Sequence, residues 1–406
     1  MRILYISQYF PPEIGATQTR AYEMARNLVR AGHHVTMLTE FPNHPAGVIP
    51  PRYRGKLFEY ADLEGIEVIR VWVKTSLVKN MHTRLLFYLS FMINATLVGL
   101  FLARGKYDLI YATSPPLFVG GAGIALRWLK RVPLVFEVRD LWPESAVTLG
   151  ELKNTSFIRW AYRFEEMCYR RARKIVVTAQ EIMDSLVARG VPAEKLALVR
   201  NGSNTELFYR DPEARQRVRQ LLGLEGKFIA LYAGLHGLAY DLDTVLETVH
   251  LLRETLDIYF IFIGDGPTKA AAQQRARELD LQNISFLPAQ PYREIPDFFN
   301  AADVSLIPMK EPHIVGTLPI KIYDSMACQL PVIACGTGEI QTVIQESGAG
   351  LALEPEDPQQ LRGAILKLYS NPEQRARYGR NGRQVVEIQF NRLAQAQQLE
   401  RILTTI

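Results

Sequence analysis

The chain has 406 residues, too many for one ordinary domain and enough for two. Apolar residues make up 48% and charged residues 22%, so the composition is that of a globular protein and excludes a disordered or fibrous one. The three cysteines form no CxxC pair and have no histidine at ligand spacing, which predicts neither a disulfide framework nor a bound metal.

Charge divides the chain into unequal halves. Residues 1–200 hold 27 Lys and Arg against 17 Asp and Glu, a net charge of +10, and the remaining residues are net acidic. A basic half predicts contact with something anionic: a membrane face, a phosphorylated acceptor or a nucleic acid. The sequence contains no Cys/His finger, no aromatic-basic RNA-binding strand and no repeat, so we expect no nucleic-acid partner.

Short apolar runs alternate with amphipathic stretches along the first half. Continuous apolar runs of this kind are typical of parallel strands that are buried on both faces of a sheet. Strands are predicted at 2–9, 33–39, 66–73, 108–113, 133–138, 174–179 and 196–200. Between the first two, apolar residues recur at i, i+3, i+4, i+7 and i+8 from Ala21, which predicts an amphipathic helix that ends at Gly32.

The stretch from Leu85 to Ala103 breaks this rhythm because it contains no charged residue. Its length approaches the roughly 20 residues that a membrane span needs. Basic residues flank it on both sides, namely Lys79, Arg84, Arg104 and Lys106. A core helix between two strands fits this pattern, and so does an interfacial helix that enters one leaflet. A true span fits less well, because it would separate two strands of one sheet across the membrane.

The alternating pattern restarts after a turn-rich stretch at 201–209. Strands are predicted at 228–234, 258–264, 284–288, 304–308 and 331–335, with helices between them. The fold class is therefore α/β, with two doubly wound domains in tandem. Residues 1–204 form the first predicted domain and residues 205–387 the second.

The loops at strand ends are the candidate binding sites, because ligands of doubly wound folds bind beyond the carboxyl ends of the strands. In the first domain, Gly15 lies just before a helix, where free N–H groups can approach phosphate. The run RDLWPES follows the fifth predicted strand and supplies Arg139, Asp140 and Glu144. Asp140 is a candidate to orient or deprotonate an acceptor hydroxyl, and Arg139 to hold an acceptor phosphate. A buried structural Arg–Asp pair is the alternative.

The second domain repeats this arrangement. Gly234 and Gly237 follow its first strand and leave room for a ligand beside the backbone. The second strand ends in a tight turn suited to a flat base, formed by Gly264, Asp265 and Gly266. Turn formation alone would also explain these glycines.

The stretch 316–334 reads GTLPIKIYDSMACQLPVIA and joins the last two predicted strands. Its helix begins at a proline, with Lys321 near the start and Asp324 one turn on. The positive end of a helix and a lysine suit a diphosphate, and a carboxylate one turn later suits a ribose diol. Four strand-end loops of this domain therefore predict a nucleotide-diphosphate site. A solvated Lys–Asp pair would explain the charges but not the convergence of the loops.

Seven stretches in this order carry a family resemblance: ISQYFPPEIGA, DLIYATSPPLF, RDLWPES, VRNGSNTELF, YAGLHG, GDGP and GTLPIKIYDSMACQLPVIA. Together they resemble the retaining glycosyltransferases of family 4, and most closely the bacterial O-antigen and capsule transferases of the N-acetylfucosamine type. The resemblance spans essentially the whole chain. It implies the GT-B fold, in which two Rossmann-like domains face an interdomain cleft. It also implies that a C-terminal helix, here about 388–406, crosses back to the first domain.

The resemblance further implies roles for individual residues. Gly15 would help to hold the donor diphosphate, the 264–266 turn would border the base, and Asp324 would bind the ribose as the second member of the family's Glu-x7-Glu pair. The main chain of Thr317, Leu318 and Pro319 would lie near the sugar. The first domain would hold the acceptor.

Two departures from the family pattern affect the donor site. Gly316 stands at the first position of the carboxylate pair, where the family has its sugar contact. Leu235, His236 and Tyr240 stand in the region of the usual Arg/Lys pair for the diphosphate. His236 is kept as a donor-binding candidate, and Lys321 is the candidate replacement for the missing pair.

The predicted function is transfer of a sugar, with retention, from a UDP-sugar donor. The acceptor would be a polyprenyl-diphosphate-linked sugar, the transferred group an N-acetylated hexosamine, and the setting the synthesis of a bacterial surface polysaccharide. The predicted location is the cytoplasm, with peripheral attachment to the inner-membrane surface. Asp140 and Lys321 are the catalytic candidates. No metal or other cofactor is expected, because Lys321 and helix dipoles supply positive charge. A UDP-sugar 2-epimerase and a non-catalytic sugar-nucleotide-binding protein are the alternatives.

Overall fold

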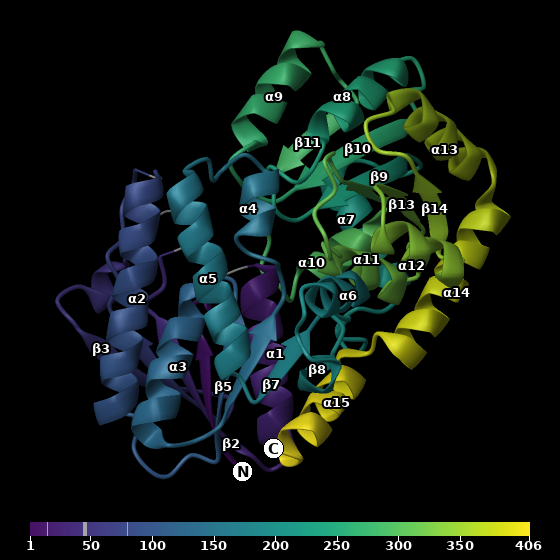
Figure 1. Cartoon of the computed structure of the whole chain (residues 1–406). Helices are drawn as coiled ribbons and strands as arrows, with labels where there is room; N and C mark the ends of the chain where they lie inside the picture. Colours follow the sequence, from purple (N-terminus) through teal and green to yellow (C-terminus); the bar gives the residue numbers. More distant parts are fainter. Residues whose placement is uncertain (14, 44–46, 79) are drawn as a thin grey trace. The chain divides into compact units, whose positions relative to one another are not determined.

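A computed structural model of the protein describes residues 1–406 except 14, 44–46 and 79 (Figure 1). The chain divides into two compact units. Unit 1 comprises Met1–Arg200 and Leu393–Ile406, and unit 2 comprises Asn201–Arg392. Each unit is built on a mainly parallel sheet with helices between the strands, so the predicted α/β class is confirmed.

The sheet of unit 1 has eight strands in the order β3-β4-β2-β1-β5-β6-β7-β8. The β3–β4 pair is antiparallel, and the other neighbouring pairs are parallel. The strands are β1 (Arg2–Ser7), β2 (His34–Glu40), β3 (Phe58–Leu63), β4 (Ile66–Val71), β5 (Leu109–Ser114), β6 (Leu134–Val138), β7 (Lys174–Val177) and β8 (Leu196–Leu198).

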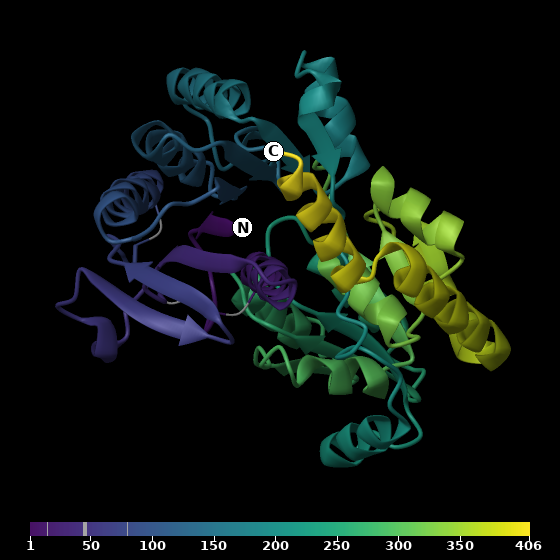
Figure 2. The ribbon, with the colours of Figure 1, turned by 90° about the horizontal axis from the view of Figure 1, so that it is seen from below.

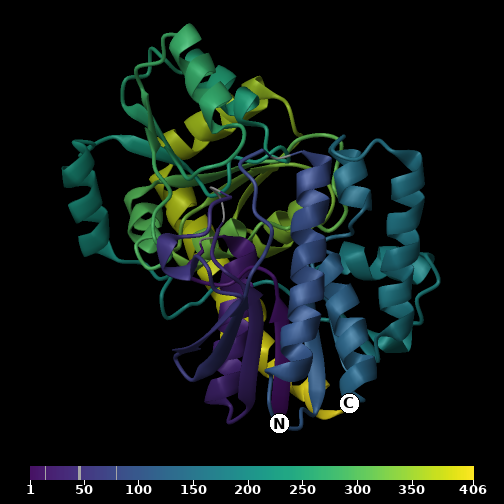
Figure 3. The same ribbon diagram turned by 90° about the vertical axis from the view of Figure 1, so that its left-hand side faces the viewer.

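Helices cover both faces of this sheet. They are α1 (Ala16–Arg30), α2 (Met81–Phe101), α3 (Phe118–Lys130), α4 (Glu144–Thr148), α5 (Thr155–Arg171), α6 (Gln180–Ala188) and α15 (Arg392–Thr404), with short 3-10 turns at Pro51–Tyr53 and Ala193–Lys195. Helices α1 and α15 share one hydrophobic cluster with alternate residues of the strands. Helices α2, α3 and α5 lie side by side (Figures 1 and 3). Because α15 belongs to unit 1, both ends of the chain lie there (Figure 2).

Unit 2 has a six-stranded parallel sheet in the order β11-β10-β9-β12-β13-β14. Its strands are β9 (Phe228–Ala233), β10 (Ile258–Ile263), β11 (Ile284–Leu287), β12 (Val304–Pro308), β13 (Val332–Cys335) and β14 (Gly350–Leu353). Its helices are α7 (Pro212–Leu222), α8 (Leu242–Leu251), α9 (Lys269–Glu278), α10 (Ile295–Ala301), α11 (Ile320–Ala327), α12 (Glu339–Ser347), α13 (Pro358–Ser370) and α14 (Pro372–Gln389). Separate hydrophobic clusters lie on the two faces of the sheet.

The sequence patterns miss two edge strands, β3 and β14. Strand β3 alternates between exposed and half-buried residues and includes two acidic side chains, because an edge strand faces solvent and needs no continuous apolar run. Strand β14 is only four residues long and begins at Gly350, which weakens any strand signal.

The division between the units also differs by a few residues from the predicted boundary at 204. Residues 201–204 belong to unit 2 because their polar groups bond within it. Ser203 N donates to Phe390 O (2.9 Å), and Arg392 N donates to Ser203 O (3.0 Å).

Helix α2 (Met81–Phe101) covers most of the 85–103 stretch; it begins four residues earlier and ends two residues before Ala103. It is long and apolar enough to cross a membrane by length and composition, but only 17% of its most apolar window is buried. Phe91, Ala95 and Gly99 form its buried face. The opposite face leaves four large apolar side chains exposed, namely Leu86 (54%), Ile93 (53%), Leu97 (49%) and Phe101 (70%). The structure therefore contradicts the alternative of a helix enclosed in the core.

A buried ion pair ties α1 to the centre of the unit 1 sheet. Arg20 Nη2 lies 2.7 Å from Glu137 Oε1, and the side chains are 2% and 0% exposed. The hydroxyls of Tyr111 (2.7 Å) and Thr113 (2.5 Å) also donate to Glu137. Burial alone would raise the pKa of Glu137, but the charges of Arg20 and Arg139 and the donated hydrogen bonds hold that pKa below its usual value. Glu137 is therefore ionised inside the protein.

We predict that Glu137→Gln lowers the free energy of unfolding of unit 1 by about 3–5 kcal/mol, because it leaves the buried Arg20 charge without its counterion. Urea unfolding followed by hydrogen–deuterium exchange of unit 1 peptides measures the change. Glu166→Gln, on the exposed side of α5, is the matched control and should alter stability by less than ~0.5 kcal/mol. Equal effects of the two substitutions would show that the pair does not stabilise the unit.

Candidate functional site

Two glycine loops meet at the carboxyl edge of the unit 2 sheet. Gly234 follows β9 and Gly264 follows β10, and Gly234 N donates to Ile263 O (2.8 Å). Gly264 has a φ of +140°, and a Cβ on it would lie 1.8 Å from the carbonyl oxygen of Gly234. Only glycine fits there, so the two loops that the sequence singled out lie in direct contact.

The next residues link the same two loops. His236 N donates to Asp265 O (2.9 Å), and Thr268 donates to His236 O from both its N (3.1 Å) and its Oγ1 (2.8 Å). A Cβ on Gly266 would lie 2.4 Å from His236 O, so this turn also requires glycine. Gly237 lies beside the Leu235 side chain in the same loop.

The His236 ring packs inside this loop. It is fully buried, stacks on Tyr232 with ring centroids 5.3 Å apart, and lies 6.2 Å from the ring of Phe262. Burial, and then the charges of Lys269 and Lys321, lower the pKa of His236 to about 4. The ring is therefore neutral at pH 7, and it is the main chain of His236 that bonds to Asp265 and Thr268.

Lys321 lies beside Gly234, where the sequence analysis placed a diphosphate. Its Nζ is 3.9 Å from the ring centroid of Tyr232 and 4.0 Å from that of Tyr240. A Cβ on Gly234 would lie 3.4 Å from this Nζ. The Nζ is buried and has no hydrogen-bond partner among the residues that the structure describes. The rings of Tyr232 and Tyr240 stabilise a cation through their π faces, but they carry no negative charge to neutralise it.

Burial lowers the pKa of Lys321 well below its usual value. An anion next to the Nζ would reverse this effect, because an opposite charge favours the protonated form. A phosphate group beside Lys321 would therefore supply the negative charge and the hydrogen-bond acceptor that the Nζ lacks among the described residues.

Asp324 lies one turn further along α11 and is 8% exposed. Its Oδ1 accepts a hydrogen bond from Ser203 Oγ (2.7 Å). The loop before α11 contains Gly316, with a φ of +73°, and the 317–319 segment that leads into the helix. Thr317 N donates to Ile314 O (3.0 Å), Leu318 is buried, and Pro319 is the N-cap residue.

Sequence reasoning missed three residues of this site. Tyr232 is hidden in an apolar strand, and Ser203 was quoted in a family motif without a role. Lys269 opens α9, and its Nζ donates to Gly264 O (2.6 Å) and Leu287 O (3.0 Å). The short spacing between Gly264 and Lys269 is a signal that could have found this residue.

In unit 1 the structure brings Arg139 next to the helix that follows Gly15. Arg139 Nε donates to Ser114 O (2.9 Å) and Nη1 to Thr17 O (3.2 Å), in the first turn of α1, for which Gly15 is the N-cap residue. Its Nη2 is buried without a hydrogen-bond partner among the described residues. Arg139 Nε also lies 3.9 Å from Glu137 Oε2. The alternative of an Arg139–Asp140 pair is thus replaced by an Arg139–Glu137 pair.

Asp140 and Glu144 follow on the same loop and helix. Asp140 Oδ2 accepts a hydrogen bond from Ser145 Oγ (3.1 Å), and burial raises the pKa of Asp140 above its usual value. Glu144 is the first residue of α4 and is partly exposed. A partly desolvated carboxyl group of this kind is a suitable proton acceptor.

No group of three or more His, Cys, Asp or Glu side chains in the described part of the chain is placed to hold a metal ion.

Two models of known protein families match the chain. A model described as a glycosyl transferase 4-like domain matches residues 15–202, and one described as glycosyl transferases group 1 matches residues 214–385. The chain belongs to the family 4-type glycosyltransferases. The N-acetylfucosamine specialisation that the resemblance implied stays a prediction.

Two curated glycosyltransferases illustrate the relationship. The putative colanic acid biosynthesis glycosyl transferase WcaI of Escherichia coli (strain K12) is 25% identical over 386 residues, which cover 92% of this chain and 93% of WcaI. The probable glycosyltransferase WbjE of Pseudomonas aeruginosa is 26% identical over 237 residues, which cover 57% of this chain and 59% of WbjE.

Solved structures establish the fold of this glycosyltransferase. Sucrose-phosphate synthase from Thermosynechococcus elongatus superposes with a TM-score of 0.79 at 20% identity, covering 100% of this chain and 98% of that one. Anabaena HepE in complex with UDP-glucose gives a TM-score of 0.76 at 18% identity, with 100% of both chains covered. The GT-B fold that the resemblance implied is confirmed.

We predict that Gly264→Ala disrupts this site, because the new Cβ would overlap the Gly234 carbonyl and force the two loops apart. The free energy of unfolding of unit 2 should fall by about 2 kcal/mol or more, and binding of UDP should be lost. Calorimetric titration with UDP and urea unfolding measure the two effects.

The matched control is Gly363→Ala, inside helix α13, where a Cβ meets nothing within 4 Å. This control should gain about 0.5–1 kcal/mol from helix propensity and bind UDP normally. A Gly264→Ala protein with unchanged stability would mean that the loops do not need their close approach.

Proposed function

We propose that this glycosyltransferase transfers a sugar from a UDP-sugar to a polyprenyl-diphosphate-linked sugar acceptor, with retention of anomeric configuration. The observation that carries the proposal is the buried Lys321 Nζ, which has π faces around it, no hydrogen-bond partner among the described residues, and Gly234 beside it. HepE is described in complex with UDP-glucose, which supports a UDP-sugar donor for this chain. WcaI is named a putative colanic acid biosynthesis glycosyl transferase, which supports a role in bacterial surface polysaccharide synthesis. We propose an N-acetylated hexosamine as the transferred group on the family resemblance alone.

The proposed donor site follows the geometry of unit 2. The diphosphate would lie between Lys321 and the start of α11, where the helix dipole adds positive potential. The turn over 264–266 would border the base, and Asp324, held by Ser203, would accept hydrogen bonds from the ribose. Within unit 1, Arg139 lies against the first turn of α1, for which Gly15 is the N-cap residue, and would hold a phosphate of the acceptor.

The proposed reaction is a front-face displacement. The bond between the sugar C1 and the UDP oxygen breaks, the acceptor hydroxyl oxygen bonds to C1 from the same face, and the hydroxyl proton passes to the departing diphosphate. Asp140 orients the hydroxyl, and Lys321 stabilises the charge that develops on the leaving group. The reaction as proposed uses no metal or other cofactor.

A direct assay tests the proposal. The protein is incubated with a panel of UDP-sugars, with and without polyprenyl-diphosphate-linked sugars, and UDP release and the anomeric configuration of the product are measured. Acceptor-dependent UDP release, retained configuration and insensitivity to EDTA are expected. Formation of an epimer without acceptor would establish the epimerase alternative, and UDP-sugar binding without either reaction would establish a binding protein. The matches to glycosyltransferases give the epimerase alternative no support.

We predict that Lys321→Met weakens UDP binding and slows turnover by at least ~10-fold, because a hydrogen bond to a charged group contributes about 1.5–3 kcal/mol. Met keeps most of the buried volume between the two tyrosine rings, so the fold should persist. Lys367→Met, on the exposed surface of α13, is the control and should behave like the parent. Unchanged kinetics in Lys321→Met would remove this residue from the donor site.

We further propose that the enzyme works in the cytoplasm while attached peripherally to the inner-membrane surface through α2. The exposed apolar face of α2 is flanked by Arg84, Arg104 and Lys106. The neighbouring helices α3 and α5 add exposed Trp128 (79%) and Trp160 (44%). Each basic side chain near an anionic leaflet contributes about 1 kcal/mol, and the apolar side chains add to that contribution.

We predict that the protein sediments with phosphatidylglycerol vesicles at low salt and is released at high salt. The double variant Ile93→Glu/Leu97→Glu should weaken binding at least ~10-fold, because it places two charges on the membrane-facing side of α2. The control is Leu221→Glu/Leu256→Glu, which changes two leucines of unit 2 that are 77% and 72% exposed. A parent protein that stays in the supernatant at low salt would favour a soluble acceptor.

A further inference from the structure

The amine of Lys321 is enclosed by two aromatic rings and a glycine of unit 2. Its Nζ lies 3.9 Å from the centroid of the Tyr232 ring and 4.0 Å from that of the Tyr240 ring. On the remaining side, a Cβ on Gly234 would lie 3.4 Å from the Nζ. Strand β9, the loop after it and helix α11 therefore fix the position of one nitrogen atom.

The Tyr240 ring is held in place by its own main chain and by Tyr232. Tyr240 N donates to Gly237 O (3.1 Å), and the N of the next residue, Asp241, donates to Pro308 O at the end of β12 (2.9 Å). An isolated antiparallel bridge joins Tyr240 to the residue after Pro308. The Tyr240 ring packs edge-on against the Tyr232 ring, with centroids 5.7 Å apart. The ring face that contacts the Nζ is thus fixed by β9 and β12.

Other titratable groups lie on the neighbouring loops and helices, but none of them forms an ion pair with Lys321 in the described part of the chain. The carboxylates accept hydrogen bonds from other donors: Asp241 from Thr244 N (3.2 Å), Asp265 from Gly266 N (2.8 Å), Glu311 from His313 N (2.9 Å) and Asp324 from Ser203 Oγ (2.7 Å), with Glu339 at the start of α12. The cationic groups are Lys269, which donates to Gly264 O and Leu287 O, exposed Lys310, and Arg383 of α14, which donates to Phe208 O and Ala327 O.

A buried amine has two protonation states with different requirements. The neutral amine needs no counterion and can direct an N–H group at a ring face. The ammonium is attracted by ring faces, but inside a protein it also requires an anion. Burial lowers the pKa of Lys321 well below its usual value, which favours the neutral amine. A diphosphate beside the Nζ would supply negative charge and acceptor oxygens, and the ammonium would then become the stable form.

We propose that Tyr240 is a positioning residue of the donor site: with Tyr232 it holds Lys321 as a neutral amine, which takes up a proton from solvent when a nucleotide diphosphate binds. The proton bonds to the lone pair of the Nζ, and the resulting ammonium pairs with a phosphate oxygen. No bond of the nucleotide breaks in this step. This role rests on the proposed function, because the diphosphate must lie beside Lys321.

Proton uptake makes the affinity for the nucleotide depend on pH. Where the free protein holds the amine and the complex holds the ammonium, the affinity falls by up to about 10-fold for each unit that the pH rises. His236 does not supply this dependence, because its pKa of about 4 keeps the ring neutral at and above pH 7. The enclosed lysine therefore gives the donor site a measurable property that a permanently charged lysine would not give.

The test counts the protons that the protein takes up with UDP. UDP is titrated calorimetrically into the protein in buffers of different ionisation enthalpy, at about pH 8 and about pH 9. The slope of the observed heat against the ionisation enthalpy of the buffer gives the number of protons. The parent should take up more than ~0.5 proton per UDP at one or both pH values, and its affinity should fall between them.

Variants of Tyr240 test the role of its ring. Tyr240→Leu removes the ring face and admits water to the Nζ, so Lys321 should already be protonated in the free protein. Its proton uptake should fall below ~0.2 per UDP, and its affinity should change less than ~2-fold over the pH range. Tyr240→Phe keeps the ring face and should restore the proton uptake of the parent. Tyr369→Leu, at an exposed tyrosine of α13, is the matched control and should also keep the parent's proton uptake.

Thermal unfolding checks that each variant is folded, and Tyr240→Met, which keeps more of the buried volume, replaces Tyr240→Leu if the latter is not. The proposal is overturned if the parent binds UDP without proton uptake, or if the folded variant without the ring keeps the parent's proton uptake. A loss of affinity with an unchanged number of protons would show that Tyr240 only supports the loop.

These outcomes are separable from those of the proposed function. UDP binding without proton uptake would overturn the role of Tyr240 and leave the UDP-sugar site standing. Proton-linked UDP binding in a protein that transfers no sugar would support the role of Tyr240 and count against the proposed reaction. A parent that binds no UDP would overturn both.

Discussion

Parallel hydrogen bonding brings the carboxyl ends of neighbouring strands to one edge of each sheet, and the candidate site residues depend on this constraint. The strands at the centre of both sheets are buried on both faces, so polar groups gather where the strands end. In unit 2 this places Gly234 and Gly264 in contact and brings the start of α11 beside them. In unit 1 it places Arg139 against the first turn of α1.

Burial disfavours the charged form of both Glu137 and Lys321. The partners of each group decide whether it stays charged. Glu137 stays ionised because Arg20 and two hydroxyls compensate its desolvation. Lys321 has no such partner among the described residues, and its pKa falls. Breaking a satisfied buried pair destabilises the fold, whereas a buried lysine without a partner marks a place where an anion is expected to bind.

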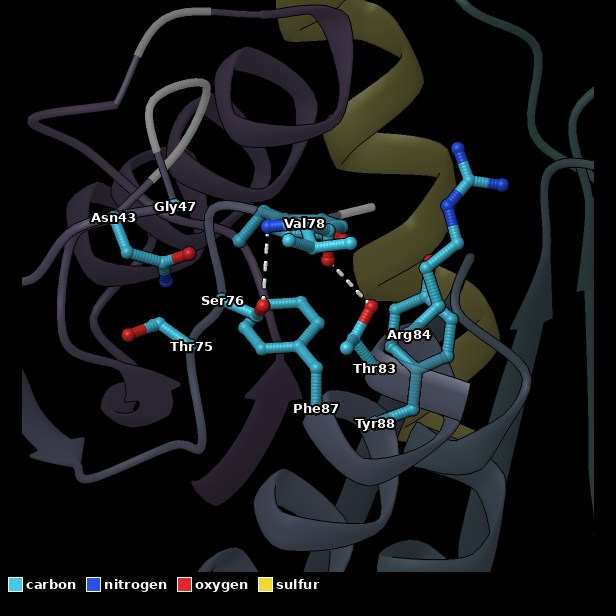
Figure 4. A pocket seen from close by; sticks show the side chains of 10 residues that line it. Asn43, Gly47, Thr75, Ser76, Val78, Thr83, Arg84, Phe87 and Tyr88 are labelled. Carbon is cyan, nitrogen blue, oxygen red and sulfur yellow. Dashed lines mark hydrogen bonds between the residues drawn. The ribbon is translucent and has the colours of Figure 1, made fainter. Parts of the chain in front are cut away.

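The two units present chemically different surfaces. Unit 2 offers tight glycine turns and a buried lysine, which suit a compact anionic ligand such as a nucleotide diphosphate. Unit 1 offers a small cavity lined by polar and aromatic side chains (Figure 4) and an amphipathic helix with one apolar face exposed, which suit an amphipathic ligand. This division supports the proposed reaction between a nucleotide sugar and a lipid-linked acceptor.

The sequence by itself determined the α/β class, the positions of the central strands along the chain, the glycine turns and the helix that carries Lys321 and Asp324. These features depend on local patterns, since continuous apolar runs, glycine spacing and a proline at a helix start act over a few residues. It missed β3 and β14, because an exposed edge strand and a four-residue strand carry little of that pattern.

Only the tertiary structure decided which partner each polar group has. It paired Arg139 with Glu137 rather than Asp140, and it placed Lys321 between Tyr232 and Tyr240. It also held Asp324 with Ser203, 121 residues away, and formed a cavity from segments after β2 and β4 and the start of α2. Contacts of this kind join residues far apart in the chain, and their energies depend on burial. Neither the long-range contacts nor the burial that sets their energies can be read from the spacing of residues along a sequence.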